Sequence, residues 1–198
     1  MVEIVVILCA YLLGSIPSGV WIGKLFFKTD VREHGSGNMG TTNTFRVLGK
    51  TAGTIVLILD ITKGTVAALL PIWFGLNIHP MAVGIFAVIG HVFPIFAGFK
   101  GGKAVATSAG IVIGAQPLFA FLILIFGVTL YVSRMVSLAS IVTSIIAAIA
   151  SLFLGDWIFA TIVWLAMIIV IIRHRSNIER IKNGSESKVP FGLNKTKK

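Results

Sequence analysis

The stretch AVATSAGIVIGAQPLFAFLILIFGVTLYV, residues 104–132, decides how many times this chain crosses a membrane. It holds no charged side chain over 29 residues, whereas one spanning helix needs about 20. Gly114-Ala115-Gln116-Pro117 interrupts it, and a proline disfavours helix in the residue before it. The stretch therefore forms either one long crossing or two shorter ones.

The positive charges that follow this stretch distinguish the two layouts. A single crossing would place Arg134 and the basic end of the chain outside, against the preference of Lys and Arg for cytosolic loops. Two crossings, 104–115 and 117–133, avoid this, and we predict them, with the short first one buried among its neighbours. The outer loops, which hold no Lys or Arg, would then be 77–79, 115–117 and 155–156.

The composition of the whole chain agrees with a membrane protein. Of 198 residues, 56% are hydrophobic and 12% charged, about half the charge of a soluble domain. In a polar chain, a net charge of +10 would suit nucleic-acid binding, but this chain is too apolar for that. We therefore interpret the charge as Lys and Arg collected on one side of a membrane. Cys9 stands alone, which excludes an internal disulfide and a cysteine metal cluster.

These patterns predict an all-α integral membrane protein with seven transmembrane segments, one of them short. Glu3 precedes the first apolar run and Lys24 follows it, the reverse of a cleavable signal peptide, so the N-terminus is expected outside and the C-terminus in the cytosol. We expect a single domain over 1–190 and a basic, disordered tail over 191–198. The apolar runs are 3–27, 53–76, 80–98, 104–115, 117–133, 137–154 and 157–172.

In this layout, the polar loops 28–52, 99–104 and 133–137 and the tail from residue 173 share the cytosolic face, where they can converge into one site. The richest of them is Gly35-Ser36-Gly37-Asn38-Met39-Gly40-Thr41-Thr42-Asn43-Thr44-Phe45-Arg46. Its glycines allow backbone N–H groups to form a concavity for phosphate oxygens. A plain flexible loop is the alternative, but the density of small donors followed by an arginine favours an anion site. The candidate residues are Gly35, Ser36, Gly37, Asn38, Gly40, Thr41, Thr42, Asn43 and Arg46.

A second glycine cluster, Lys100-Gly101-Gly102-Lys103, opens the short helix at 104 and leads to Thr107. Backbone N–H groups at a helix N-terminus point toward anions. It is not a Walker A loop, because Ala104 stands where a magnesium-binding Ser or Thr would be. We expect Lys103 to bind a phosphate, and we expect the charge of Lys100 only to keep this loop on the cytosolic side of the membrane.

Other polar residues interrupt the apolar runs. Asp60 and Lys63 lie on one helix face, and charges inside a span pair with one another; they form either a structural pair or part of the site. His91 and the basic flank after residue 172 each have an ordinary structural explanation as well. The remaining candidates are Ser137 and Ser140, which share a face, and His174, Asn177 and Arg180.

A cytosolic site with two anion loops and few acids suits phosphorylated substrates. An enzyme of lipid metabolism and a small-anion transporter both fit. A transporter would place its site near the midplane, so the enzyme is favoured. No His, Cys, Asp or Glu cluster has metal-ligand spacing, and neither a metal nor a cofactor is expected.

Several ordered motifs lie between residue 14 and about residue 190. They are Gly14-Ser15-Ile16-Pro17-Ser18-Gly19, Gly35 to Arg46, Asp60-x-x-Lys63-Gly64, Gly90-His91-x-Phe93-Pro94, Phe99-Lys100-Gly101-Gly102-Lys103-x-x-x-Thr107, and Arg173-His174-x-x-Asn177-x-x-Arg180 with Gly184 and Glu186. Together they resemble the bacterial acyl-phosphate:glycerol-3-phosphate acyltransferases, the PlsY family. The resemblance implies transfer of a fatty acyl group from acyl phosphate to the 1-hydroxyl of sn-glycerol 3-phosphate, the first step of bacterial phospholipid synthesis, giving lysophosphatidate and phosphate.

The residue chemistry and the resemblance together give a hypothesis for the site. The donor's phosphate would bind the Ser36–Asn38–Thr42 loop, and the phosphate of glycerol 3-phosphate would bind Arg46, Lys103, Ser140, His174 and Asn177. The catalytic candidates are Ser36, Asn38, Arg46, Lys103, Ser140, His174 and Asn177. The remaining candidates bind substrate. The expected partners are acyl phosphate, glycerol 3-phosphate and the lipid bilayer, without nucleic acid. The protein is expected to be a monomer in the bacterial inner membrane with its site facing the cytosol.

Overall fold

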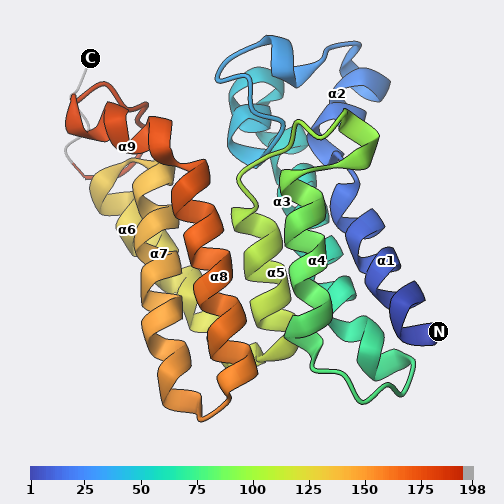
Figure 1. Cartoon of the computed structure of the whole chain (residues 1–198). Coiled ribbons are helices and arrows are strands. Elements are labelled where there is room, and N and C mark those ends of the chain that lie inside the picture. Colours follow the sequence, from blue (N-terminus) through green and yellow to red (C-terminus); the bar gives the residue numbers. More distant parts are fainter. Residues whose placement is uncertain (194–198) are drawn as a thin grey trace. The chain divides into compact units, whose positions relative to one another are not determined.

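The computed structural model describes residues 1–193 and contains helices and no strand within that range. The chain divides into two compact units, unit 1 from Met1 to Pro117 and unit 2 from Leu118 onward. Figure 1 shows the helices of each unit, and the two units are described separately below.

Unit 1 is organised around one long helix, α3 (Thr41–Trp73). The other helices of the unit, α1 (Val2–Ser15), α2 (Ser18–Phe27), α4 (Pro80–Val92) and α5 (Val105–Ala115), all pack against α3. Glycines allow the close approach: a Cβ on Gly64 would lie 2.3 Å from the carbonyl oxygen of Thr107, and one on Gly110 2.1 Å from that of Ile61. Small residues at such crossings let helices pack tightly in a membrane protein. Two one-turn 3₁₀ helices, Val31–Glu33 and Ile95–Ala97, lie in the connections.

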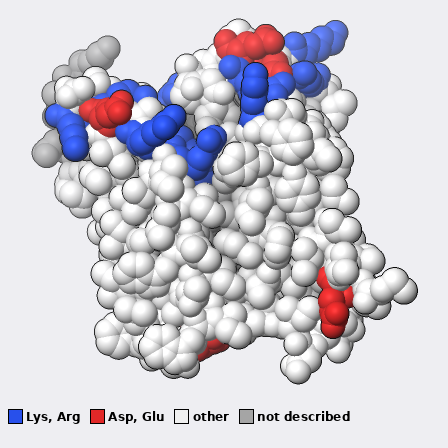
Figure 2. Space-filling view, in the orientation of Figure 1, with Lys and Arg blue, Asp and Glu red and all other residues white. Residues whose placement is uncertain are grey.

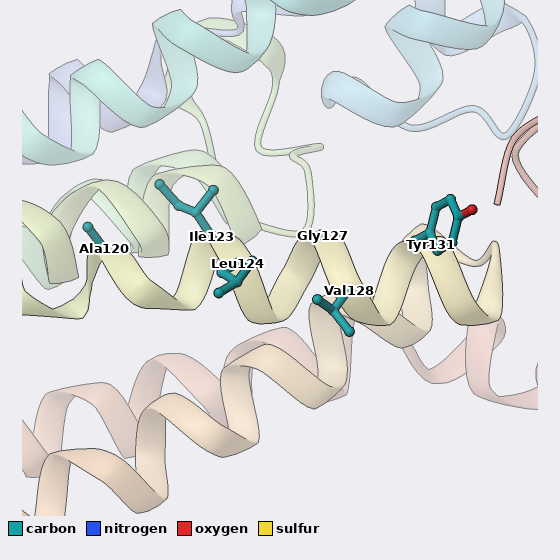
Figure 3. Close-up of a pocket in the computed structure, with 6 residues that line it drawn as sticks. All are labelled: Ala120, Ile123, Leu124, Gly127, Val128 and Tyr131. Carbon is teal, nitrogen blue, oxygen red and sulfur yellow. The ribbon is translucent and has the colours of Figure 1, made fainter. Parts of the chain in front are cut away.

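Unit 2 contains α6 (Leu122–Ser133), α7 (Val136–Ser151), α8 (Trp157–Arg173) and α9 (Arg175–Lys182), with short 3₁₀ helices at Pro117–Phe121 and Leu152–Leu154. α7 packs against both α6 and α8, and α9 packs against α7 and α8. One face of α6 is an open apolar groove, and Figure 3 shows its lining along this helical stretch, from Ala120 to Tyr131. The side chains that line this groove are apolar apart from the hydroxyl of Tyr131.

The predicted break in the stretch 104–132 is confirmed, since α5 ends at Ala115 and a new helical stretch begins at Pro117. An 11-residue helix is about 16 Å long, shorter than the hydrocarbon core of a bilayer. By length and composition, three helices could cross a membrane, or up to five if each bent pair is one span, and the α5 and Pro117–Ser133 helices are shorter. The count of seven crossings stays a prediction.

The expectation of one continuous helix over residues 3–27 is wrong. α1 and α2 are bent by 48° at Ile16-Pro17. Proline has no N–H to continue the helix, and the bend leaves the carbonyl of Ile16 open to the Lys63 ammonium, which donates to it at 2.9 Å. The bend is thus stabilised by a charged side chain from α3.

One other boundary differs from the prediction. Helix α3 begins at Thr41, so the second half of the predicted anion loop is helical; Gly49, with φ of 86°, interrupts it before the apolar part. The basic flank after residue 172 forms α9, which is bent by 59° from α8. The structure describes residues 191–193 of the predicted disordered tail, where the backbone N–H of Leu193 donates to the carbonyl of Tyr131. The rest of that tail lies outside the described residues.

Candidate active site

The loop before α3 has the backbone shape expected of an anion cradle. Gly35 and Gly37 have φ of 62° and 70°, in the left-handed region that favours glycine. Between them Ser36 is exposed, and its hydroxyl reaches the surface. Asn38 accepts a hydrogen bond from the N–H of Gly40, the residue that caps α3. The loop therefore ends at a helix N-terminus, where N–H groups are available to an anion.

Asn43 holds this loop from inside. It is 1% exposed, and its amide nitrogen donates to the carbonyls of Val31 (2.7 Å) and His34 (3.0 Å). Its amide oxygen accepts from the N–H of Ser36 at 2.8 Å. Asn43 was predicted to contact substrate, but the structure commits both ends of its amide to the loop backbone. Its contribution is the shape of the cradle.

The other predicted residues of this stretch lie on the first turns of α3. Thr42 and Arg46 are exposed and four residues apart, so they share one helix face. A Cβ on Gly35 would lie 3.4 Å from Cδ of Arg46, which brings the arginine beside the loop. Thr41 has a buried hydroxyl with no hydrogen-bond partner in the described structure.

An ion cluster anchors the start of the same connection. Asp30 accepts hydrogen bonds from the backbone and guanidinium of Arg32 and pairs with Lys24 at 3.2 Å. These contacts, chiefly the Arg32 guanidinium, outweigh burial and hold the pKa of the Asp30 carboxyl well below its usual range. Arg32 also donates to the carbonyl of Ala97 at 3.4 Å, which ties this connection to the one before α5.

The glycine loop before α5 lies flat on the end of α4. A Cβ on Gly101 would lie 2.2 Å from the carbonyl oxygen of His91, and one on Gly102 would lie 2.2 Å from His91 Nε2. Lys103 follows, half-buried, and Ala104 caps α5 in a left-handed conformation with φ of 58°. Both glycines are thus required by close contact with His91, and they set the direction in which Lys103 leaves the loop.

Three predicted binding residues of unit 1 lie in the interior. His91 is 3% exposed, Lys63 6% and Thr107 0%. Lys63 pairs with Asp60 at 2.8 Å in addition to its bond to Ile16, which favours the structural alternative for that pair. None of the three presents its side chain at the surface of the loops, so the geometry favours support over direct substrate contact.

In unit 2, Glu186 gathers three of the predicted residues. Its carboxylate accepts from Ser137 Oγ (2.7 Å), Asn177 Nδ2 (2.7 Å) and Arg180 Nε (2.8 Å). Burial raises the pKa of Glu186, but the hydrogen bonds from these three side chains and the charge of Arg180 outweigh it, so its pKa is lowered. One carboxylate therefore joins the start of α7 to α9.

His174 and Ser140 are the other predicted residues of unit 2. His174 is 3% exposed and lies at the bend between α8 and α9, with Nδ1 2.8 Å from the carbonyl oxygen of Val170. Because a carbonyl oxygen only accepts, Nδ1 is the donor in this contact. Ser140 donates to the carbonyl of Val136 in its own helix.

Comparison with known proteins identifies the family. The family model for glycerol-3-phosphate acyltransferase matches residues 4–184, nearly the whole chain. The chain belongs to this acyltransferase family. Curated glycerol-3-phosphate acyltransferases from Streptococcus thermophilus and Streptococcus gordonii are 56% and 57% identical to it. These matches cover 98% and 96% of this chain, and 96% and 94% of the relatives.

The acyltransferase is also similar to solved structures of PlsY (YgiH), an integral membrane glycerol 3-phosphate acyltransferase. The glycerol 3-phosphate form matches with a TM-score of 0.88 and 39% identity, and the lysphosphatidic acid form with 0.84 and 38%. These matches cover 96% and 95% of both chains. The protein is therefore an integral membrane enzyme, and the expected resemblance is confirmed.

Two side chains of the acyltransferase that we did not predict as site residues prove central to these clusters. Asp60 was seen only as the partner of Lys63, and Glu186 only as part of the last motif. Acidic residues are rare in this basic chain, and this rarity could have singled out both carboxylates. Among residues 1–193, no group of three or more His, Cys, Asp or Glu side chains is placed to hold a metal ion.

Proposed function

We propose that this acyltransferase moves a fatty acyl group from an acyl phosphate to the 1-hydroxyl of sn-glycerol 3-phosphate, giving lysophosphatidate and phosphate. The observation that carries the proposal is the pair of glycine loops at the N-termini of α3 and α5, each with a cation nearby, Arg46 and Lys103. The connections that carry the two loops meet within unit 1, since Met39 and Ala97 pack in one apolar cluster. Two such loops suit a reaction in which both substrates are phosphorylated.

The acceptor and the product have independent support. The similar PlsY structures are described in a glycerol 3-phosphate form and a lysphosphatidic acid form. Glycerol 3-phosphate is an acceptor with a free hydroxyl, and a lysophosphatidate is that acceptor carrying one acyl chain. The acyl phosphate donor is implied by the resemblance of the sequence motifs, and the two anion loops are compatible with it.

In unit 1, we assign the donor's phosphate to the loop of Ser36, Asn38 and Thr42, and the acceptor's phosphate to Arg46 and Lys103. Ser36, Thr42 and Arg46 are exposed, so a substrate can reach their side chains. Because both substrates are anions, fixed cations offset their repulsion and hold the hydroxyl near the acyl carbon. In unit 2, Ser140, His174 and Asn177 remain the proposed catalytic residues.

The chemistry needs no protein nucleophile, because an acyl phosphate is already an activated mixed anhydride. The acceptor's 1-hydroxyl oxygen attacks the acyl carbon, and the bond between that carbon and the phosphate oxygen breaks. Phosphate leaves with the electron pair, and the hydroxyl proton passes to a base. Backbone N–H groups of the glycine loops are suited to the oxyanion that forms on the acyl oxygen.

We also propose that both loops face the cytosol, with the N-terminus outside and the C-terminus inside a bacterial inner membrane. Support comes from the charges of each unit. In Figure 2, the Lys and Arg atoms of unit 1 gather at the end that carries α2, and those of unit 2 at the end that carries α9. Positive charge of this kind marks the cytosolic side.

The proposal is tested with purified protein and glycerol 3-phosphate, offering acyl phosphate, acyl-CoA and acyl carrier protein thioester as separate donors. We expect lysophosphatidate from acyl phosphate alone. Lys103→Ala should reduce turnover more than 100-fold, whereas Lys100→Ala, three residues earlier and exposed, should stay within twofold. Equal turnover with acyl-CoA, or anion flux into liposomes without acyl transfer, would contradict the proposed reaction.

A further inference from the structure

Five buried polar side chains lie behind the loop that carries Lys103. They are Ser18 at the start of α2, Asp60 and Lys63 on α3, His91 on α4 and Thr107 on α5, and none is more than 6% exposed. Polar groups buried among apolar helices are costly unless they are paired. Because they do not reach the surface, an effect on substrate must pass through a neighbour.

The contacts of these side chains converge on one edge of the His91 ring. Asp60 Oδ1 accepts from Ser18 Oγ (2.9 Å) and pairs with Lys63 Nζ (2.8 Å), which fixes the carboxylate. The same oxygen lies 3.9 Å from His91 Nδ1. Thr107 Oγ1 lies 3.2 Å from that nitrogen, within hydrogen-bond range. The Nδ1 edge of the ring is therefore held by α3 and α5.

The opposite edge of the ring faces the loop. The three atoms nearest to a Cβ on Gly102 would all belong to the His91 ring, with Nε2 at 2.2 Å, Cδ2 at 3.1 Å and Cε1 at 3.2 Å. The N–H of Gly102 also donates to the carbonyl of His91 at 3.1 Å. The loop thus rests on His91 through both backbone and ring, one residue before Lys103.

We propose that His91 is a positioning residue for Lys103, with its ring held by Asp60 and Thr107. The ring supports Gly102, and Gly102 sets where the Lys103 side chain begins. A ring that loses its hold on the Nδ1 side can turn or shift, and the loop moves with it. This inference rests on the proposed role of Lys103 in binding the phosphate of glycerol 3-phosphate, and it predicts that the network controls affinity for that substrate.

The first test compares Thr107→Val, Thr107→Ser and Thr65→Val by KM for glycerol 3-phosphate and kcat with saturating acyl phosphate. Thr65 is the matched control, because its hydroxyl also bonds across the α3–α5 interface, to the carbonyl of Gly110, without touching His91. We expect Thr107→Val to raise KM about tenfold, the effect of one buried hydrogen bond, with kcat within twofold. Thr107→Ser should restore KM, and Thr65→Val should leave it within twofold.

The second test uses the contact between the ring and Gly102. Gly102→Ala alone should raise KM at least tenfold, because its Cβ meets the ring. In the double variant with His91→Ala, the ring is absent, so Gly102→Ala should raise KM for glycerol 3-phosphate less than twofold above the KM of His91→Ala alone. Independent, multiplying effects of the two substitutions would overturn the proposal.

Direct calorimetry of glycerol 3-phosphate binding to the same variants separates the two levels of inference. If the wild-type protein does not catalyse the proposed reaction, but Thr107→Val and Gly102→Ala still weaken its binding of glycerol 3-phosphate, the proposed function is refuted and the positioning role of His91 is retained. An unchanged KM and unchanged binding in Thr107→Val, or an equal loss in Thr65→Val, would refute the positioning role.

Discussion

Asn43→Ala gives a sharp test of the cradle before α3, because one buried side chain holds three points of that loop. The substitution removes the two bonds that the amide donates, to the carbonyls of Val31 and His34, and the one that it accepts from the N–H of Ser36. The helix itself should persist, since alanine is a strong helix former. The expected damage is therefore to the shape of the loop.

The free-energy cost of Asn43→Ala depends on which of the three backbone groups can bond to water instead. Val31 is fully buried, and without Asn43 its carbonyl keeps only a long bond from the N–H of His34 (3.4 Å), so losing the bond from Asn43 costs about 1–3 kcal/mol. His34 and Ser36 are exposed, and water replaces their bonds at a net cost of about 0.5 kcal/mol each. The total of about 2–4 kcal/mol shifts the balance between ordered and open loop about 30- to 1000-fold.

The assay is steady-state acyl transfer with varied acyl phosphate, together with limited proteolysis of the loop. We expect Asn43→Ala to raise KM for acyl phosphate at least tenfold and to make the loop cleavable. Asn43→Asp should be no better, because it keeps the acceptor but turns a carboxylate toward two carbonyls. Thr29→Val, which removes one exposed bond earlier in the same connection, is the control and should stay within twofold. A KM near wild type for Asn43→Asp would refute the reasoning.

Two further predictions concern stability. The pKa of Glu186 is lowered in the folded protein, so its carboxylate stabilises the fold fully above its usual pKa of 4.5, and this contribution is lost as the pH falls through the lower folded value. Glu186→Gln should therefore lower the melting temperature at pH 7. The difference in melting temperature from the wild-type protein should become smaller below about pH 4.5. Gly64→Ala should destabilise the protein by about 1–3 kcal/mol, because its Cβ would lie 2.3 Å from the carbonyl oxygen of Thr107. Gly127→Ala, with nothing within 4 Å of its Cβ, should be neutral or stabilising in the same detergent unfolding experiment.

The elements that sequence patterns predicted well are those with a local cause. Pro117 separates two helical stretches because it has no N–H and restricts the residue before it. Gly35 and Gly37 adopt positive φ because they have no Cβ. The bend at Pro17 has the same local cause as the break at Pro117, but the high average hydrophobicity of residues 3–27 suggested one continuous helix.

The roles of the polar residues were harder to predict, because burial and hydrogen-bond partners depend on distant segments. Asn43 and Thr107 were expected to face substrate, yet both are buried, on a loop backbone and on His91 respectively. The neighbours of Asn43 are polar and include glycine, in the same way as those of the exposed Ser36, so nothing beside it indicates burial. Thr107 lies among mostly apolar residues of α5, and its partner His91 belongs to another helix.

The sequence by itself determined that this is an apolar helical protein with two glycine loops and clustered cations, and its motifs determined its family. Composition and backbone stereochemistry are carried by each segment alone. Only the tertiary structure decided which polar side chains support the loops, because their partners lie far away in the chain, as Asp60 does from Ser18 and Glu186 from Ser137. A hydrogen bond needs its two atoms at about 3 Å, and helix packing alone sets that distance.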